Sequence, residues 1–238
     1  MRWTAAVSVP AVLLLTACGE ERGSNPALQR MVEEATAIRE TQRSMPNSPL
    51  LYYRLGQTFE KYEFPDSAAT AYEASVGLHP AFAQAHFRLG VIYHGMGQHD
   101  KSISAYQRVV RFQPDNSEAH NNLGYLHRRS GNLAAAEAAY REAIRIDSSF
   151  AEAHNNLAQV YKELEEWPQA IEHFRRAMVA DPKLRAAYLN LARAYERMGQ
   201  KSEERALLQE MKERFGGTSK EGRYASARLA KLWVGPLD

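Results

Sequence analysis

The fold is decided by the stretch from Ser117 to Phe150, which reads SEAHNNLGYLHRRSGNLAAAEAAYREAIRIDSSF. A shift of 34 residues toward the C-terminus finds a related stretch that starts at Ala151, and the opposite shift finds one that starts at Ala83. Further copies precede and follow these, so the units run without insertion as 49–82, 83–116, 117–150, 151–184 and 185–218. A fixed period of this length indicates a solenoid or another repeat array.

Each unit has the pattern of a helical hairpin when its positions are numbered 1 to 34. Positions 7, 8 and 11 lie on one stripe of a first helix, with a small residue at position 8 where a second helix must come close. Position 15 is often glycine, which suits the left-handed end of a helix. A second periodic segment carries a small residue at position 20 and an aromatic at position 24. Proline at position 32 ends that helix. The glycines are Gly97, Gly131 and Gly199, and the prolines are Pro80, Pro114 and Pro182.

This period and this placement of small and large residues resemble the tetratricopeptide repeat (TPR) family over residues 49–218. The resemblance implies an all-α, right-handed superhelix of five helix-turn-helix repeats with a flanking helix at each end. Repeat 5 departs from the pattern, because its second helix has Glu204 at position 20 and Leu208 at position 24. A carboxylate is costly at a tight helix crossing, so we expect this helix to tilt or to be more exposed than its counterparts.

The flanking segments read as caps for the terminal repeats. Residues 26–46 are in register with the second helix of a missing repeat, so we expect them to cover the first helix of repeat 1. Residues 219–238 read as a last helix and a tail. Four apolar residues there are expected to cover repeat 5: Tyr224, Ala227, Leu229 and Trp233.

Residues 1–17 have the features of a secretory signal peptide: an early basic residue, an apolar run and a small-residue ending. The run ends in Leu15-Thr16-Ala17-Cys18, which resembles the bacterial lipoprotein box, and Cys18 is the single cysteine of the chain. The resemblance implies lipidation of Cys18, a tether over residues 18–25 and attachment to a membrane. The alternative is an ordinary secretory leader that happens to contain a cysteine.

The resemblance to lipoproteins also carries a location. Gly19 follows the cysteine, whereas the common signal for retention in the inner membrane is Asp at that place. We therefore expect the protein on the outer membrane, facing the periplasm. In an organism without an outer membrane, the expectation is the outer face of the inner membrane or the cell surface.

Catalysis and nucleic-acid binding receive no support from the sequence. The 30 basic and 28 acidic residues nearly balance, and no basic cluster stands out. Phosphate-binding loops, nucleophile elbows and the HExxH and CxxC motifs are all missing. The phrase AHNNLG at 119–124 is similar to repeats that precede a glycosyltransferase domain in O-linked N-acetylglucosamine transferases, but only about twenty residues follow repeat 5. We expect no enzyme activity, no cofactor and no small-molecule substrate.

Histidine recurs at position 4, as His86, His120 and His154. Two interpretations are possible, a metal ladder and partly buried packing residues. Equivalent helices stack at roughly 8–10 Å, whereas zinc needs each imidazole nitrogen at about 2.0–2.1 Å. These three side chains therefore cannot share one metal ion, and the packing interpretation is favoured.

Position 6 points to binding, since it lies on the side of the first helix that faces the concave groove in TPR proteins. It is occupied by Arg54, Arg88, Asn122, Asn156 and Asn190. An asparagine amide offers one acceptor and two donors, so it can pair with a peptide unit of any sequence. The resemblance to the glycosyltransferase repeats implies that such a ladder binds extended peptide backbone, and the two arginines would suit a carboxylate. The alternative is that these asparagines only hold water or cap the groove. Positions 5 and 9 add Tyr53, Phe87, Tyr125, Gln159 and Arg193.

The sequence therefore predicts a membrane-anchored TPR adaptor that holds a protein or peptide of the cell envelope in its groove. Family members of this layout serve outer-membrane protein assembly, pilus secretin assembly and control of peptidoglycan enzymes, and the sequence does not choose among them. The rival hypothesis is a structural or oligomerising subunit that uses its convex face or C-terminal helix. An apolar band on the exposed side of residues 219–233 would favour the rival.

Overall fold

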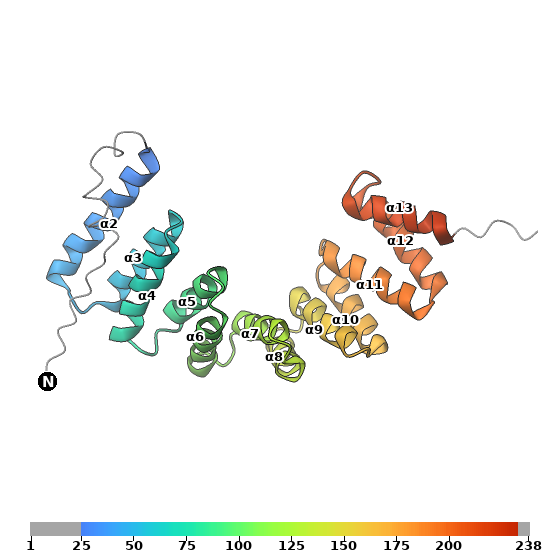
Figure 1. Cartoon of the computed structure of the whole chain (residues 1–238), viewed down its shortest axis with the longest axis horizontal. Coiled ribbons are helices and arrows are strands. Elements are labelled where there is room, and N and C mark those ends of the chain that lie inside the picture. Colours follow the sequence, from blue (N-terminus) through green and yellow to red (C-terminus); the bar gives the residue numbers. More distant parts are fainter. Residues whose placement is uncertain (1–24, 233–238) are drawn as a thin grey trace, which may run out of the picture. The chain divides into compact units, whose positions relative to one another are not determined.

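The computed structural model describes residues 25–232, which form helices and contain no strand (Figure 1). The prediction of an all-α fold is confirmed. The helices are α2 (Pro26–Ser44), α3 (Pro49–Lys61), α4 (Pro65–Leu78), α5 (Ala83–Gly95), α6 (His99–Phe112), α7 (Ser117–Arg129), α8 (Leu133–Ile146), α9 (Ala151–Glu163), α10 (Trp167–Ala180), α11 (Arg185–Met198), α12 (Lys201–Phe215) and α13 (Lys220–Leu232).

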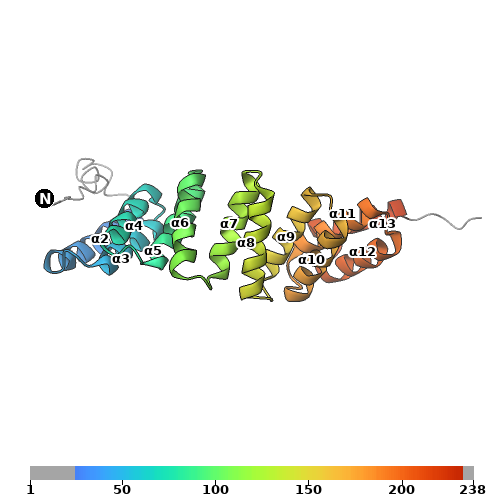
Figure 2. The ribbon, with the colours of Figure 1, turned by 90° about the horizontal axis from the view of Figure 1, so that it is seen from below.

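The chain divides into two compact units, of which the first ends at Asp115 and the second begins at Asn116. The first unit holds α2 to α6, and the second holds α7 to α13. Within each unit every helix packs on its neighbours in the sequence. In repeats 1 to 4 the two helices of one repeat make the most extensive contact, whereas in repeat 5 α12 packs more extensively on α13 than on α11. Figure 2 shows these successive helices side by side within each unit. Each unit is thus a stack of helical hairpins.

A glycine at position 8 allows the position-24 ring to lie directly on the first helix. A Cβ atom added to Gly56 would come within 2.6 Å of the Tyr72 ring, a distance that real contacts essentially never show. The equivalent pairs are Gly90 with Tyr106 and Gly124 with Tyr140, each at 2.7 Å. Repeats 4 and 5 have alanine at position 8, and there the facing residue is the smaller Phe174 or Leu208. Small and large residues are therefore matched within each hairpin.

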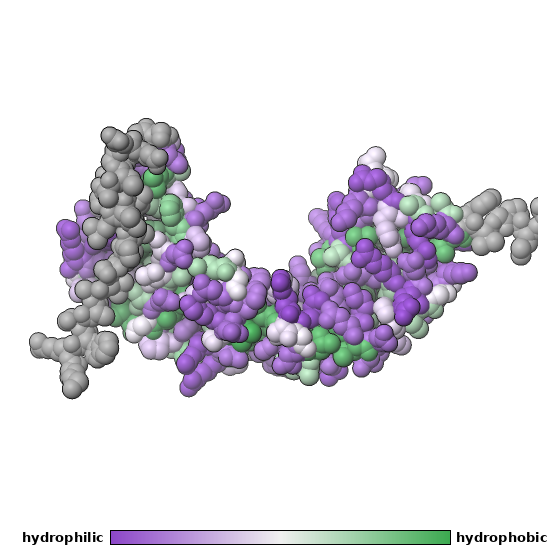
Figure 3. All heavy atoms as spheres, viewed as in Figure 1, coloured by the Kyte–Doolittle hydropathy of each residue, from purple (hydrophilic) through white to green (hydrophobic). Residues whose placement is uncertain are grey.

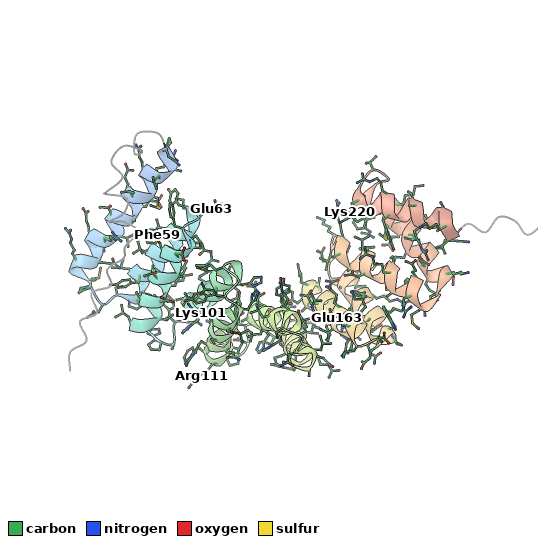
Figure 4. The ribbon with its side chains drawn as sticks, in the orientation of Figure 1. Phe59, Glu63, Lys101, Arg111, Glu163 and Lys220 are labelled. Carbon is green, nitrogen blue, oxygen red and sulfur yellow. The ribbon has the colours of Figure 1, made fainter. Side chains whose placement is uncertain are left out.

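The turn inside each hairpin uses a left-handed residue at position 15. The predicted glycines adopt φ values of 73° at Gly97, 80° at Gly131 and 68° at Gly199. Repeats 1 and 4 have glutamate there instead, and Glu63 (labelled in Figure 4) and Glu165 take φ of 63° and 60°. A non-glycine residue in this region is strained because its Cβ crowds the backbone. The hairpin geometry therefore overrides the local preference in two of the five repeats.

The N-terminal helix covers repeat 1, as predicted. Asn25 caps α2 by accepting a hydrogen bond from the Ala27 amide at 3.0 Å, and Met31 and Ala35 are buried in the core of the first unit. Lys61 at the end of α3 donates to Glu34 of α2 at 2.7 Å. The helix ends at Ser44, two residues before the predicted limit of 46.

The second helix of repeat 5 departs from its counterparts as expected, since α12 packs much less extensively on α11 than the second helices of repeats 1 to 4 pack on their partners, and a larger share of its residues is exposed. The reason is different from the one predicted, because the carboxylate itself is buried. Glu204 is only 1% exposed, and Leu208 and Met211 of α12 are fully buried. Arg228 of α13 donates to both Glu204 carboxylate oxygens, from Nε at 2.5 Å and from Nη2 at 3.3 Å. A buried carboxylate is tolerated when it is paired and hydrogen-bonded, so α12 keeps its place because α13 supplies the counter-charge.

The C-terminal helix is the first helix of a sixth, incomplete repeat, since Ser219 is position 1 in the 34-residue register. Its Ala225 and Leu232 are buried, and Tyr224 and Leu229 are partly buried as predicted. Ala227 is exposed, so its predicted covering role was wrong, and Trp233 lies outside the described residues. The helical register places Ala225 at position 7, where each full repeat has leucine, and this residue makes the contact instead.

Candidate functional site

The first helices line the inner side of the second unit. Successive first helices contact each other directly, α7 with α9 and α9 with α11, to an extent that successive second helices do not. A stack that is more closely packed on one side curves toward that side. The exposed side of α7, α9 and α11 is called here the first-helix face, and it corresponds to the groove predicted from the sequence.

Paired asparagines join the first helices across this face. Asn156 of α9 donates from Nδ2 to Oδ1 of Asn121 on α7 at 3.0 Å. One repeat further, Asn190 of α11 donates in the same way to Asn155 of α9 at 3.1 Å. Consecutive helical residues point about 100° apart, so position 5 can face the next helix while position 6 faces the previous one. These four residues are called the amide ladder.

The hydrogen bonds of the amide ladder fix its orientation and leave part of its capacity unused. Each position-6 amide spends one of its two N–H groups on the neighbouring helix. The Oδ1 of Asn156 has only a long contact, 3.5 Å, from Gln159 Nε2. Asn155 is 6% exposed, whereas Asn156 and Asn190 are partly exposed. Asn156 and Asn190 can therefore present an acceptor and a donor to a ligand, while their hydrogen bonds to Asn121 and Asn155 fix their orientation.

The other predicted residues of the second unit also lie on first helices. Asn122 is partly exposed on α7. Tyr125 of the same helix accepts a hydrogen bond from Arg129 Nη1 at 3.3 Å. Arg193 of α11 is exposed, and its guanidinium lies 5.9 Å from the centre of the Tyr224 ring. The structure thus places all six predicted residues of this unit on α7, α9 and α11.

The first unit has an ion pair where the second has amides. Arg88 donates from Nε to Glu60 Oε2 at 2.9 Å and from Nη2 to Glu60 Oε1. The hydroxyl of Tyr72 donates to the same carboxylate at 2.9 Å. Burial and this bond to Glu60 raise the pKa of Tyr72, so the hydroxyl stays a donor. Arg88 therefore already binds a carboxylate of its own chain, which leaves Arg54 as the exposed cation predicted at this end.

The two predicted aromatic residues of the first unit are half-buried and take part in the core. Tyr53 lies with its ring centre 5.4 Å from that of Tyr72 and 5.1 Å from that of Phe82. Phe87 meets Tyr106 edge-on at 5.5 Å. These contacts are of the kind that stabilise aromatic clusters, so both rings contribute to packing as well as to the partly exposed surface.

The position-4 histidines make different local contacts. His86 is buried and its Nε2 lies 2.9 Å from the Pro80 carbonyl. His154 is also buried, with Nε2 3.2 Å from the Ser148 carbonyl and Nδ1 3.0 Å from Nδ1 of His173. Burial, followed by the proximity of His154, lowers the pKa of His173 to about 4. The rings of His154 and His173 are therefore neutral at pH 7.

Neither a metal site nor a membrane span is evident in the part of the chain that the structure describes. Between residues 25 and 232, no three His, Cys, Asp or Glu side chains come close enough together to hold a metal ion. None of the helices in that range has the length and apolar content needed to cross a bilayer. Cys18 and the rest of the predicted leader lie outside the described residues.

Asn121 and Asn155 are the site residues that the sequence interpretation missed. The available signal was the doublet Asn-Asn, which recurs 34 residues apart at 121–122 and 155–156. Only one member of each doublet was assigned to the groove. A neighbour on a preceding helix lies 35 residues away in the sequence, so the pairing of position 6 with position 5 emerges only when the hairpins are stacked.

A chain of stacked helical hairpins with a polar inner face is an α-solenoid of the kind that presents binding surfaces. Models of the tetratricopeptide repeat match residues 53–116, 95–149, 151–184 and 186–218. The chain belongs to the tetratricopeptide repeat family. No curated protein sequence matches it.

Solved structures of TPR proteins share this fold. The crystal structure of MamA matches with a TM-score of 0.64 at 22% identity, over 80% of this chain and 98% of MamA. PilF of Pseudomonas aeruginosa matches with a TM-score of 0.68 at 15% identity, over 92% of this chain and 97% of PilF. YrrB, described as a TPR protein with an unusual peptide-binding site, has a TM-score of 0.67 at 14% identity, with coverages of 81% and 99%. At such identities the similarity establishes the fold.

Proposed function

We propose that this protein is an adaptor that binds an extended segment of a partner protein along its first helices. The observation that carries the proposal is the amide ladder. Asn156 and Asn190 are fixed by Asn121 and Asn155, yet each keeps hydrogen-bonding capacity toward the first-helix face. Pre-oriented amides bind backbone with a smaller loss of side-chain entropy than free ones. Membership of the TPR family and the peptide-binding site named for YrrB support the same class of function.

The test is capture of partner proteins from a membrane extract by the protein with its face intact and with Asn122, Asn156 and Asn190 all changed to Ala. Each lost amide should weaken binding by about 0.5–1.5 kcal/mol. The matched control changes three exposed glutamines on second helices, Gln107, Gln169 and Gln209, to Ala. Both variants should keep wild-type helical circular dichroism. Equal capture by the asparagine variant and the wild type would show that the partner uses another face.

We also propose that Cys18 carries lipid and holds the adaptor on a membrane of the cell envelope, with the outer membrane facing the periplasm as the favoured place. The support is the sequence Leu15-Thr16-Ala17-Cys18 and the single cysteine. Several acyl chains on one residue give a lasting anchor, whereas one chain gives marginal binding. Mass spectrometry of the mature protein should find an acylated Cys18. A Cys18→Ser protein that still sediments with membranes would contradict the proposal.

The rival role as an oligomerising subunit through the C-terminal helix finds no apolar band on the described part of α13. The exposed residues of this helix are Lys220, Arg223, Ala227, Ala230 and Lys231. The visible face of the second unit in Figure 3 is likewise mostly hydrophilic, with apolar residues scattered among charged ones. A polar inner face with a charged terminal helix supports the adaptor.

A further inference from the structure

Cations collect along one edge of the first-helix face in the second unit. The C-terminal ends of α7, α9 and α11 carry, at positions 12 or 13, the exposed Arg129 and Arg197 and the partly exposed Lys162. Arg193 adds a fourth charge at position 9 of α11. These four residues are called the basic edge.

The acidic residues beside the basic edge are paired with other cations, although Arg228 is shared between Glu196 and Glu204. Glu163 accepts an ion pair from Arg128 at 2.6 Å, and its position at the end of α9 is labelled in Figure 4. Glu196 is bound by Arg228 of α13 at 2.9 Å. None of the four residues of the basic edge takes part in an ion pair within residues 25–232. The edge therefore has a surplus of positive charge available to a ligand.

The opposite edge carries carboxylates on two of the three helices, whereas α11 begins there with Arg185, which is paired with Glu221 at 3.1 Å. Glu118 and Glu152 are exposed at the N-terminal ends of α7 and α9, where a negative charge also suits the helix dipole. The amide ladder lies between the two edges. A strand that runs along the ladder would therefore have one row of its side chains over cations and the other row over carboxylates or solvent.

Resting on the proposed function, we infer that the first-helix face of the second unit takes an extended segment whose side chains are acidic at every second or third residue. Adjacent helices are spaced at about 8–10 Å, and an extended chain advances about 3.3 Å per residue. One acidic side chain per helix on the same row matches this spacing. The amides would hold the backbone, and the basic edge would select the charge.

A purely structural account of these cations also exists. Basic residues near helix C-termini interact favourably with the helix dipole. Three of the four cations also lie over aromatic rings: Arg129 at 6.0 Å from Tyr125, Arg193 at 5.9 Å from Tyr224 and Arg197 at 6.0 Å from Trp167. That account predicts an effect on stability and none on the choice of ligand. The two accounts therefore differ in a measurement of binding with charged and neutral peptides.

The experiment titrates two labelled synthetic peptides of about eight residues, the length that spans three helices. One repeats Glu-Thr and the other Gln-Thr, so that they differ only in charge. At low salt the Glu-Thr peptide should bind about tenfold more tightly, and the difference should shrink toward about twofold at high salt because exposed charges are screened. Binding of both peptides at equal strength would overturn the inference and leave the proposed function standing. Binding of neither would overturn both.

Amino-acid substitutions test whether the basic edge causes the tighter binding of the Glu-Thr peptide. Changing Arg129, Lys162, Arg193 and Arg197 together to Gln should bring the Glu-Thr peptide to the affinity of Gln-Thr without altering the latter. The matched control changes four exposed cations of the first unit that lie outside the predicted groove to Gln, namely Arg43, Lys101, Arg108 and Arg111. Arg111 lies on α6, one of the second helices, and is labelled in Figure 4. An equal loss in the control would assign the preference to net charge and overturn the inference.

A single change guards against loss of fold in the fourfold variant. Lys162 makes no ion pair within residues 25–232 and lies in the last turn of α9, so Lys162→Glu is expected to fold. This variant should weaken the Glu-Thr peptide and strengthen a Lys-Thr peptide by a similar factor. Loss of affinity for Glu-Thr without the gain for Lys-Thr would contradict a direct role of this edge in selecting charge.

Discussion

The two units of the chain share one repeat and one register but differ in the polar groups that join successive first helices. In the first unit Glu60 and Arg88 form an ion pair, with Tyr72 as a further donor. In the second unit asparagines at positions 5 and 6 form the amide ladder. In an ion pair the two charges neutralise each other, whereas a hydrogen-bonded pair of amides still has N–H donors and carbonyl acceptors that are not used. The same scaffold thus joins its first helices by charge in one unit and by amides with spare hydrogen-bonding capacity in the other.

The largest expected effect compares two arginines that each bind a carboxylate. Arg228→Ala leaves Glu204, 1% exposed, without a counter-charge, and should lower the free energy of unfolding by about 3–5 kcal/mol. Arg88→Ala leaves a carboxylate that is 24% exposed, and should cost only about 1 kcal/mol. Urea unfolding of both variants measures the difference. The double change Glu204→Leu with Arg228→Leu is the control, and it should be close to neutral.

The second unit should also respond more strongly to acid. The pKa of His173 falls from 6.5 to about 4 through burial and the nearby His154, and burial lowers the pKa of His154 too. Between pH 6.5 and pH 4 the unfolded chain therefore binds more protons at these histidines than the folded chain does. The stability that their neutral forms contribute is fully present above pH 6.5 and declines as the pH falls toward 4. The slope should be up to about 1.4 kcal/mol per pH unit for each proton.

Burial sets the sign of this effect, and the charged groups around the two histidines change its size. Arg176 and Arg141 disfavour a proton on His173, whereas Glu172 favours one, and Asp147 favours one on His154. Replacing His173 by Gln removes one titrating group and should flatten the decline, as followed by thermal unfolding from pH 7 to pH 4. An unchanged pH profile in His173→Gln would show that other groups carry the acid sensitivity.

A third comparison, of Asn155→Leu with Asn155→Asp, distinguishes the hydrogen bond that Asn155 accepts from the packing of its side chain. Asn155→Leu removes the oxygen that Asn190 Nδ2 reaches at 3.1 Å, and should cost about 1–2 kcal/mol of stability because a donor loses its partner. Asn155→Asp keeps an oxygen in the same place and should cost less. If Asn155→Asp destabilised the fold as much as Asn155→Leu, the hydrogen bond would not be the reason for the asparagine.

The smallest effect is relief of the strained turns, one in each unit. Glu63→Gly and Glu165→Gly put glycine where φ is 63° and 60°. Release of the strain is partly offset by the greater freedom of glycine in the unfolded chain, so each change should stabilise by about 0.5 kcal/mol. Glu33 of α2 and Glu213 of α12 are exposed and have ordinary backbone conformations by this criterion, and changing either to Gly should destabilise instead. Thermal unfolding of the four variants distinguishes the two behaviours.

Most of the backbone could be predicted from the sequence, because a repeated pattern reports the same local physics five times. The hairpins, the left-handed glycines and the covering role of α2 follow from spacing, propensity and helix termination. The burial of Glu204 in α12 was not predicted, for an identifiable reason. Glu204 looked unpaired as long as its partner, Arg228, was sought within the same repeat, whereas it lies 24 residues further on in α13.

By itself, the sequence determined the period, the alternation of first and second helices and the matched small and aromatic residues, since these depend on contacts within one hairpin. Only the tertiary structure decided the polar contacts between hairpins: Arg88 with Glu60, Asn156 with Asn121 and Glu204 with Arg228. The 34-residue period places each residue at a position in its helix but leaves open which neighbour it reaches. That choice depends on the direction and length of side chains across a stack of helices, and these exist only once the hairpins have packed.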